Sequence, residues 1–389
     1  MMTSIRLAER LKKIRPSPTL AITAKAKKLK TEGKDVVSFA AGEPDFDTPE
    51  PIKIAAAAAI SAGFTKYTPT TGIPELKKLI AAKFLKDNKM EYDPRQIVVS
   101  CGAKHSIFNV LMALVDRGDE VVIPSPFWVS YPEMVNLCEG SPVLVECSAK
   151  NEFRMTASQF AGSLTPKTKV LILNSPSNPT GCVYPKNELE AIAETCVKRG
   201  IVVISDEIYE KIIFDDLEHC SIGALNKDIF GLTVTVNGLS KSHSMTGWRI
   251  GYMGAPQVIA DAVSNLQDHS TSNPASISQK AACAAMEMPD TFSLSMSAEF
   301  QKRRDYIVSR LSKMKKISYV VPKGAFYIFC DISATGLDSL SFAQKMLDEQ
   351  LVAIIPGIAF GDDACVRMSF ATGMEQIKKG IDRLELFLS

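Results

Sequence analysis

The sequence predicts an α/β protein: a mostly parallel sheet covered by helices on both faces, with a second, smaller α+β domain. Apolar strands alternate with helical stretches from residue 96 to about residue 240. Strands that are apolar throughout are typical of parallel sheets, and the helices between them supply the crossovers. After about residue 285 the strands follow one another more closely, and 389 residues suit two or three domains.

The elements of the large sheet follow from the apolar pattern. An alanine-rich stretch over 51–63 favours a helix, because alanine is the best helix former. Amphipathic spacing predicts helices over 105–118, 127–140 and 187–200, the last ending in a glycine. Strands are expected over 96–100, 120–124, 141–147, 169–174, 201–207 and 232–240.

The C-terminal part begins with a long charged helix over 296–314. Strand-like segments then lie within 317–332, 351–361 and 365–371. We therefore expect three regions. They are an N-terminal arm that also contributes to the small domain (1–47), a large domain (48–285) and a small C-terminal domain (286–389).

Composition excludes several classes of protein. The net charge is +2, which gives no electrostatic reason to expect a nucleic acid partner, and no apolar run is long enough to span a membrane. The N-terminal residues carry charges where a signal peptide has an apolar core. Nine cysteines without zinc-like spacing indicate reduced thiols, and the four histidines do not cluster. We expect a cytoplasmic protein without a metal.

Polar residues follow the strands, where ligands bind in open α/β sheets. A glycine and an alanine open the helix after the first strand, and such a helix start favours an anion. Elsewhere a carboxylate, an amide, a phenol, an amine and a guanidinium follow strand ends. The set is Gly102, Ala103, Asn178, Asp206, Tyr209, Lys241 and Arg249.

Each of these residues has a simpler interpretation when it is taken alone: a turn, a helix cap, a core position or a solvated loop. Together they fit pyridoxal 5′-phosphate. A lysine amine forms a Schiff base with its aldehyde, and a carboxylate keeps its ring nitrogen protonated so that the ring accepts carbanion electrons. An arginine and a helix N-terminus suit its phosphate.

The segment GLSKSHSMTGWRIG (238–251) resembles the lysine signature of class I pyridoxal-phosphate aminotransferases, which have the fold of type I pyridoxal-phosphate transferases. The resemblance covers nearly the whole chain, and it is closest to the bacterial aspartate aminotransferase branch, which includes prephenate aminotransferases. Further motifs occur in the expected order: AGEPDFDTP (41–49), KYTPTTGIPELK (66–77), SCGAK (100–104), PFWVSYPEM (126–134), NSPSNPTG (174–181), SDEIYE (205–210) and VRMSFA (366–371).

The resemblance implies a role for each matching residue. Lys241 would be the Schiff-base lysine, and Asp206 would pair with the ring nitrogen. The ring oxygen would contact Asn178 and Tyr209, Trp128 would stack on the ring, and Gly102, Ala103, Ser240 and Arg249 would surround the phosphate. Tyr67 would reach the phosphate of a neighbouring subunit, which implies a homodimer. Arg367, with the Gly42 backbone, would bind the substrate α-carboxylate. Many relatives carry serine where this chain has Gly238, so that phosphate contact is missing or moves to Ser240.

Substrate choice needs a second cation if the substrate is a dicarboxylate. Lys104, at the start of the helix after SCGA, is the candidate that the resemblance implies, because relatives in the aspartate branch carry a lysine there; Arg15 in the N-terminal arm is a weaker one. The resulting hypothesis is ping-pong transamination between aspartate and 2-oxoglutarate.

Several alternatives stay open. Prephenate, alanine, aromatic amino acids and diaminopimelate are other substrates, and a cyclopropane-forming elimination is another reaction on the same fold. A transcription regulator is disfavoured because residue 41 already begins the resemblance, and a dinucleotide-binding dehydrogenase lacks its GxGxxG motif.

Overall fold

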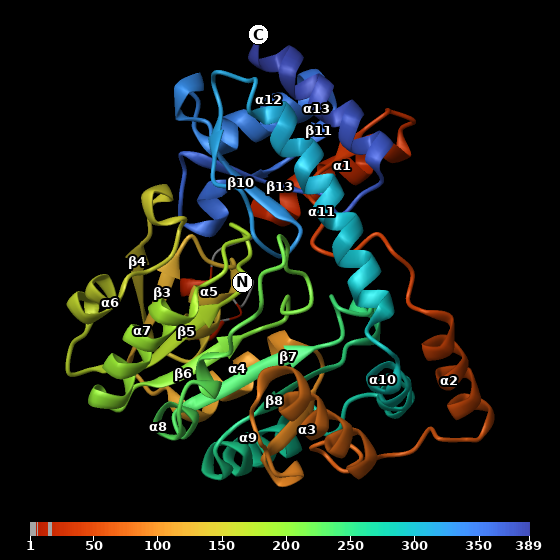
Figure 1. Cartoon of the computed structure of the whole chain (residues 1–389), viewed down its shortest axis with the longest axis vertical. Helices are drawn as coiled ribbons and strands as arrows, with labels where there is room; N and C mark the ends of the chain where they lie inside the picture. The colour runs from red at the N-terminus through yellow and green to blue at the C-terminus, as the bar shows by residue number, and fades with distance from the viewer. Residues whose placement is uncertain (1–4, 6, 15–17) are drawn as a thin grey trace.

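A seven-stranded sheet forms the centre of the larger part of the molecule (Figure 1). The computed structural model describes residues 5, 7–14 and 18–389, so Arg15 lies outside the described residues. The strand order is β2-β8-β7-β6-β5-β3-β4, and only β8 runs antiparallel to its neighbours. The strands are β2 (Ile97–Ser100), β3 (Glu120–Ser125), β4 (Ser141–Glu146), β5 (Thr168–Asn174), β6 (Val202–Asp206), β7 (Thr233–Gly238) and β8 (Gly251–Gly254).

Helices cover both faces of this sheet, which confirms the predicted fold class. Along β5, Val170 and Ile172 pack with the helices of one face, while Leu171 and Leu173 pack with those of the other. Full burial of each such side chain contributes about 1.5–3 kcal/mol. The first face carries α4 (Ala103–Leu114), α5 (Ser130–Leu137) and α9 (Gln257–Ser270); the second carries α6 (Ala157–Ser163), α7 (Lys186–Arg199) and α8 (Lys227–Phe230).

Two predicted helices are shorter than expected. The helix expected over 105–118 is α4, which begins at Ala103 and ends at Leu114. The helix expected over 127–140 is only α5, because residues 126–129 form the connection that brings Trp128 to the sheet edge. Beside β2 and β8, the helices α2 (Glu50–Ser61), α3 (Pro74–Asn88) and α10 (Ser276–Glu287) enclose a further apolar cluster.

The smaller part contains an antiparallel sheet with the order β12-β13-β10-β9. Its strands are β9 (Ser318–Tyr319), β10 (Tyr327–Asp331), β12 (Ile355–Pro356) and β13 (Cys365–Ser369). A separate parallel pair joins β1 (Val37–Ser38) to β11 (Val352–Ala353), so an N-terminal segment lies beside C-terminal ones. The domain boundaries at residues 47 and 285 stay predictions. The surrounding helices are α1 (Pro18–Thr31), α11 (Thr291–Leu311), α12 (Ser339–Gln350) and α13 (Met374–Leu388).

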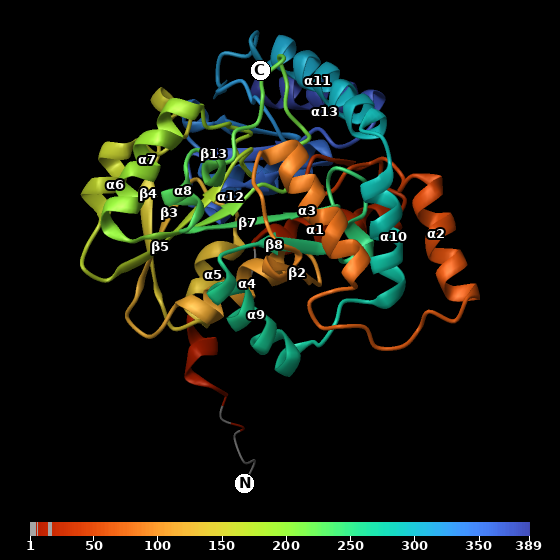
Figure 2. The same ribbon diagram turned by 60° about the horizontal axis from the view of Figure 1, so that its bottom comes forward.

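Helix α11 runs from the end near α10 to the part that contains β10 and β13 (Figures 1 and 2). Two adjacent, almost fully buried arginines hold it in place. Arg303 Nη1 lies 2.7 Å from an Asp45 carboxylate oxygen and 3.4 Å from the carbonyl oxygen of Phe370. Arg304 binds Asp215 at 2.6 Å with both of its terminal nitrogens. The helix is thereby tied to the segment before α2 and to the loop that follows β6.

Short 3₁₀ helices complete the described secondary structure, and no helix among the described residues is long and apolar enough to cross a membrane. All nine cysteines are free thiols. The 3₁₀ helices are η1 (Glu9–Lys13), η2 (Pro94–Gln96), η3 (Ala149–Asn151), η4 (Ile222–Ala224), η5 (Thr246–Trp248), η6 (Ser333–Thr335) and η7 (Gly357–Phe360).

Candidate active site

A cavity of about 460 Å³ collects most of the predicted site residues. Every predicted residue within the described part of the chain lines it except Gly102 and Tyr67. Those that line it are Gly42, Ala103, Lys104, Trp128, Asn178, Asp206, Tyr209, Ser240, Lys241, Arg249 and Arg367.

The topology of the sheet explains this convergence. Strands β5, β6 and β7 are parallel, so their carboxyl ends, and the polar residues that follow them, share one edge. Strand β8 is antiparallel to β7 and therefore begins at that same edge. Arg249, two residues before β8, arrives there from the opposite chain direction. Arg367 comes from β13 and closes the cavity from the smaller part.

The amine of Lys241 lies on a half-buried side chain that lines the cavity. It donates a hydrogen bond of 2.5 Å to the carbonyl oxygen of Gly42 and lies 6.0 Å from the centre of the Tyr209 ring. Burial lowers the pKa of Lys241 to about 8, and Arg249 and Arg367 act in the same direction. A substantial fraction of the amine is therefore uncharged, and hence nucleophilic, near pH 8.

Asp206 is a buried carboxylate at the end of β6. Its side chain accepts a hydrogen bond of 2.6 Å from the Tyr131 hydroxyl and one of 3.3 Å from the Ile208 backbone. Burial raises the pKa of Asp206 to about 6 against these two hydrogen bonds. A cationic N–H group in the cavity would favour the ionised carboxylate, because an opposite charge lowers a carboxylate pKa.

Arg367 is also buried, and burial lowers the pKa of this guanidinium. Its Nη1 donates to Asn178 Oδ1 at 2.9 Å, and its Nη2 donates to the carbonyl oxygen of Ala40 at 3.2 Å. Its centre lies 4.4 Å from the Tyr327 ring. The buried Nε has no hydrogen-bond partner. A guanidinium with an unsatisfied donor beside a cavity fits a carboxylate ligand.

The start of α4 forms an anion-binding corner with Arg249. Gly102 precedes the helix with φ at 93°, and a Cβ atom there would collide with the Arg249 guanidinium. That guanidinium also donates to the carbonyl oxygens of Thr246 (2.9 Å) and Cys101 (3.2 Å). Gly102 therefore acts on the cavity by letting Arg249 approach the helix N-terminus, where backbone N–H groups favour anions.

Steric crowding explains why position 238 is a glycine. A Cβ atom there would lie 3.0 Å from the carbonyl oxygen of Ile250 and 3.1 Å from the Cα of Gly251. Neither neighbour is the end of a flexible side chain, so a serine would require the backbone to move. Ser240, by contrast, is buried and lines the cavity.

Lys104 supplies a second cation on the same cavity. Its ammonium lies 4.7 Å from the centre of the Trp128 ring, and the Trp128 and Tyr131 rings meet edge to face at 5.2 Å. Burial, followed by the nearby Arg249, lowers the pKa of Lys104. The cavity therefore carries an arginine at one side and a lysine over an indole face at another.

One predicted residue among those described lies away from this cluster. Tyr67 is 92% exposed on the connection between α2 and α3, so its expected contact with a neighbouring subunit stays a prediction. Arg15 lies outside the described residues.

Sequence reasoning also missed residues that line the cavity. Tyr131 follows Trp128 by three positions, close to one helical turn, and this spacing could have revealed it. Tyr327 reaches the cavity through the pairing of β10 with β13, a register that no local motif encodes. Glu43, whose side chain accepts a hydrogen bond from Thr246 at 2.6 Å, follows Gly42 directly and belongs to the AGEPDFDTP motif.

Comparison with known proteins finds aminotransferases by family model, by sequence and by structure. Residues 34–384 match the family model for class I and II aminotransferases. An aspartate aminotransferase from Bacillus sp. strain YM-2 is 45% identical, over 98% of this chain and 99% of its own length. A probable aspartate/prephenate aminotransferase from Rickettsia conorii is 46% identical over 97% of both chains. The structure of Thermus thermophilus aspartate aminotransferase with maleate superposes with a TM-score of 0.95 at 40% identity, covering 99% of this chain and all of the other.

Proposed function

The chain belongs to the class I and II aminotransferases, and from this premise we propose that it is an aspartate aminotransferase. It would move the amino group between L-aspartate and 2-oxoglutarate in two ping-pong half-reactions. The observation that carries the proposal is one cavity lined by Lys241, whose pKa is lowered, and by two further cations, Arg367 and Lys104, suited to two carboxylates. The Thermus thermophilus relative was solved with maleate, which is a dicarboxylate, and this also supports the proposal.

The residues present fit pyridoxal 5′-phosphate as the cofactor. Lys241 would hold its aldehyde carbon covalently, Asp206 would bind its ring nitrogen, and Trp128 would cover a ring face. Asn178 and Tyr209 would lie at the ring oxygen, and the α4 start with Ser240 and Arg249 would hold the phosphate. The fit rests on the Lys241 amine with its lowered pKa, on the buried Asp206 carboxylate, and on the anion-binding corner. When bound, this cofactor provides an electron sink for the electrons left at the substrate Cα.

The side chains of this protein would do the remaining work. Arg367 would bind the α-carboxylate with its guanidinium and orient the Cα hydrogen toward Lys241. The Lys241 amine would accept and return that proton, because a pKa of about 8 lets it exist in both acid and base forms near that pH. Lys104 would bind the distal carboxylate.

Prephenate transamination is the second candidate. Relatives named as aspartate/prephenate aminotransferases are 43–46% identical over 97–98% of this chain, the same range as the aspartate aminotransferases. Prephenate also carries a second carboxylate, so the same pair of cations would serve it. A panel of aspartate, prephenate, alanine and aromatic substrates separates these reactions.

We further propose a homodimer with shared active sites and a cytoplasmic location. The exposed Tyr67 would complete the phosphate site of the partner. Tyr67→Phe and Lys241→Ala chains, each inactive alone, should recover part of the activity when they are refolded together. Mixed chains without activity would count against a shared site. Nine free thiols support a reducing compartment.

The visible spectrum of the purified protein tests the main proposal. We expect an absorption band of bound cofactor that aspartate alone bleaches, since the first half-reaction needs no acceptor. If aspartate leaves the band unchanged, but glutamate bleaches it and prephenate then restores it, the second candidate is favoured. A protein without such a band, even after pyridoxal phosphate is added, would refute the cofactor assignment.

A further inference from the structure

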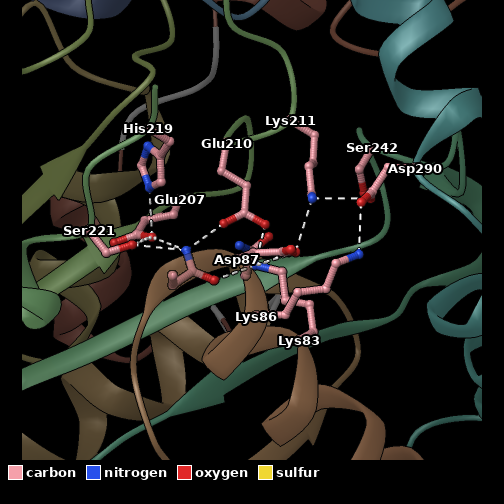
Figure 3. Close-up of polar contacts among 12 residues, drawn as sticks. Lys83, Lys86, Asp87, Glu207, Glu210, Lys211, His219, Ser221, Ser242 and Asp290 are labelled. Carbon is pink, nitrogen blue, oxygen red and sulfur yellow. Dashed lines mark hydrogen bonds and ion pairs between the residues drawn. The ribbon is translucent and has the colours of Figure 1, made fainter. Parts of the chain in front are cut away.

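Behind the candidate active site, the segment 206–211 carries a second set of polar side chains (Figure 3). Asp206 and Tyr209 line the cavity, whereas Glu207, Glu210 and Lys211 join a buried network on the other side of the segment. This alternation places a charged anchor next to each cavity residue.

Glu207 is the most enclosed member of this network, with 1% of its side chain exposed. Its Oε2 accepts hydrogen bonds from Ser221 Oγ at 2.6 Å, His219 Nε2 at 2.8 Å and Asn88 Nδ2 at 3.1 Å. Its Oε1 accepts one from Ser205 Oγ at 2.8 Å. Four donors therefore fix this carboxylate in a single orientation, one residue after Asp206.

Asn88, the last residue of α3, connects the two carboxylates of the network. Its amide nitrogen also lies 2.7 Å from Glu210 Oε2, and its Oδ1 accepts a hydrogen bond of 2.6 Å from Lys83. Lys83 in turn forms an ion pair with Glu210. The final turn of α3 is thus attached to the residues on either side of Tyr209.

Both carboxylates of this network have basic or amide partners within the protein. Burial alone would lower the pKa of His219, but the Glu207 carboxylate and Glu210 raise it above its ordinary value. His219 and the Lys83 ammonium therefore face two carboxylates. The ligand atoms of Glu207, Glu210 and His219 lie within 4.8 Å of one another, as in a metal site, but the Asn88 amide and Lys83 already satisfy the carboxylates.

We propose that Glu207, held by His219, Ser221 and Asn88, is a positioning residue that fixes Asp206 and Tyr209 for the reaction. The proposal rests on the proposed function, in which Asp206 binds the cofactor ring. Glu207 does not touch the cavity; it acts by clamping the carboxyl end of β6 to α3 and to the loop at 219–221. Supporting side chains of this kind hold functional groups in productive geometry.

The test substitutes Glu207→Gln, which keeps the shape of the side chain and one acceptor oxygen but removes the charge. We expect kcat per bound cofactor to fall about tenfold, as is typical when a supporting partner is lost. KM for aspartate should stay within about twofold, because Arg367 and Lys104 lie on other elements. Lys86→Ala is the matched control: the Lys86 ammonium pairs with Asp290 in the same cluster, and Asp290 retains Lys211 as a partner when Lys86 is removed.

A second measurement does not depend on the cofactor. The chain has four histidines, so His219 can be assigned by NMR with a His219→Gln variant and titrated in the cofactor-free protein. The His219 pKa should fall when Glu207 is changed to glutamine, because the negative partner is gone while burial remains. This titration would detect the interaction between His219 and Glu207 even if the protein did not bind pyridoxal phosphate.

Several outcomes would overturn the proposal. One is a Glu207→Gln enzyme with unchanged kcat although the His219 pKa has fallen. Another is a fall in kcat per bound cofactor that is equally large in the Lys86→Ala variant. A third is a stoichiometric metal in the purified protein whose removal reproduces the defect. If Glu207→Gln does not fold, Ser221→Ala decides instead. It removes the 2.6 Å donor to Glu207 and the Oγ that accepts from the Asn88 amide, leaves the carboxylate in place, and should lower kcat by a smaller factor.

Discussion

Replacing Lys104 by alanine tests the assignment of the distal carboxylate. An ammonium and a carboxylate 4 Å apart attract by about 4 kcal/mol at the effective dielectric constant of about 20 that suits protein sites. In the free enzyme the ammonium lies 4.7 Å above the Trp128 ring, and a partly buried cation–π contact contributes about 1 kcal/mol that competes with substrate. We therefore expect Lys104 to contribute about 2–3 kcal/mol to binding a dicarboxylic transition state.

At about 1.4 kcal/mol per factor of ten, this corresponds to a loss of about 30- to 150-fold in kcat/KM for aspartate. Alanine has no distal carboxylate, so its kcat/KM should change by less than about threefold. The assay measures both amino donors with 2-oxoglutarate at fixed ionic strength, because a charge interaction is screened by salt.

Lys104→Met is the matched control for packing. Methionine keeps an unbranched apolar side chain against Trp128 but has no charge. The Lys104→Met enzyme should therefore lose as much activity toward aspartate as the Lys104→Ala enzyme does. If Lys104→Ala lowers kcat/KM equally for aspartate and alanine, or if methionine restores aspartate activity, then Lys104 does not bind the distal carboxylate.

Three further predictions follow from the same geometry. Burial lowers the pKa of Lys241 to about 8, below that of an ordinary lysine, so cofactor-free protein should take up pyridoxal phosphate faster as pH rises to about 8 and no faster above it; a rate still rising at pH 10 would contradict this. Arg367→Lys should lower kcat/KM for aspartate and alanine alike by about 10- to 150-fold, the value of one charged hydrogen bond, and a loss confined to aspartate would reject its α-carboxylate role. Asp45→Asn should lower the free energy of unfolding, measured in urea, by about 1–2 kcal/mol, because Arg303 keeps its bonds to Glu299 and Phe370; no change would mean that solvent fully replaces Asp45.

The sequence predicted the large sheet well because its strands are apolar runs with polar residues at their carboxyl ends. That rule also placed Asp206, Asn178 and Lys241 on one edge before any geometry was known. Strand β8 escaped notice because its four residues, Gly-Tyr-Met-Gly, offer neither alternation nor branched side chains. The antiparallel direction of β8 is what explains how Arg249 reaches the same edge.

Other features needed the tertiary structure. Tyr327 meets Arg367 because β10 pairs with β13 in one register, and a pairing between distant segments leaves no local signal. The network behind β6 joins residue 88 to residues 207–221, and its members resemble an ordinary solvated charge pattern when the sequence is scanned. The contact expected of Tyr67 depends on a second chain and stays a prediction.

The two buried arginines of α11 have a consequence for how this chain can change over evolutionary time. Because consecutive residues of a helix point about 100° apart, Arg303 and Arg304 can reach Asp45 and Asp215 together only at one rotational setting. A single-residue insertion earlier in α11 would turn both guanidiniums away from Asp45 and Asp215 and leave them only their partners within the helix, Glu299 and Asp305. Substitutions on the exposed face of α11 should therefore accumulate freely, while its length between Asp290 and Arg303 should not vary.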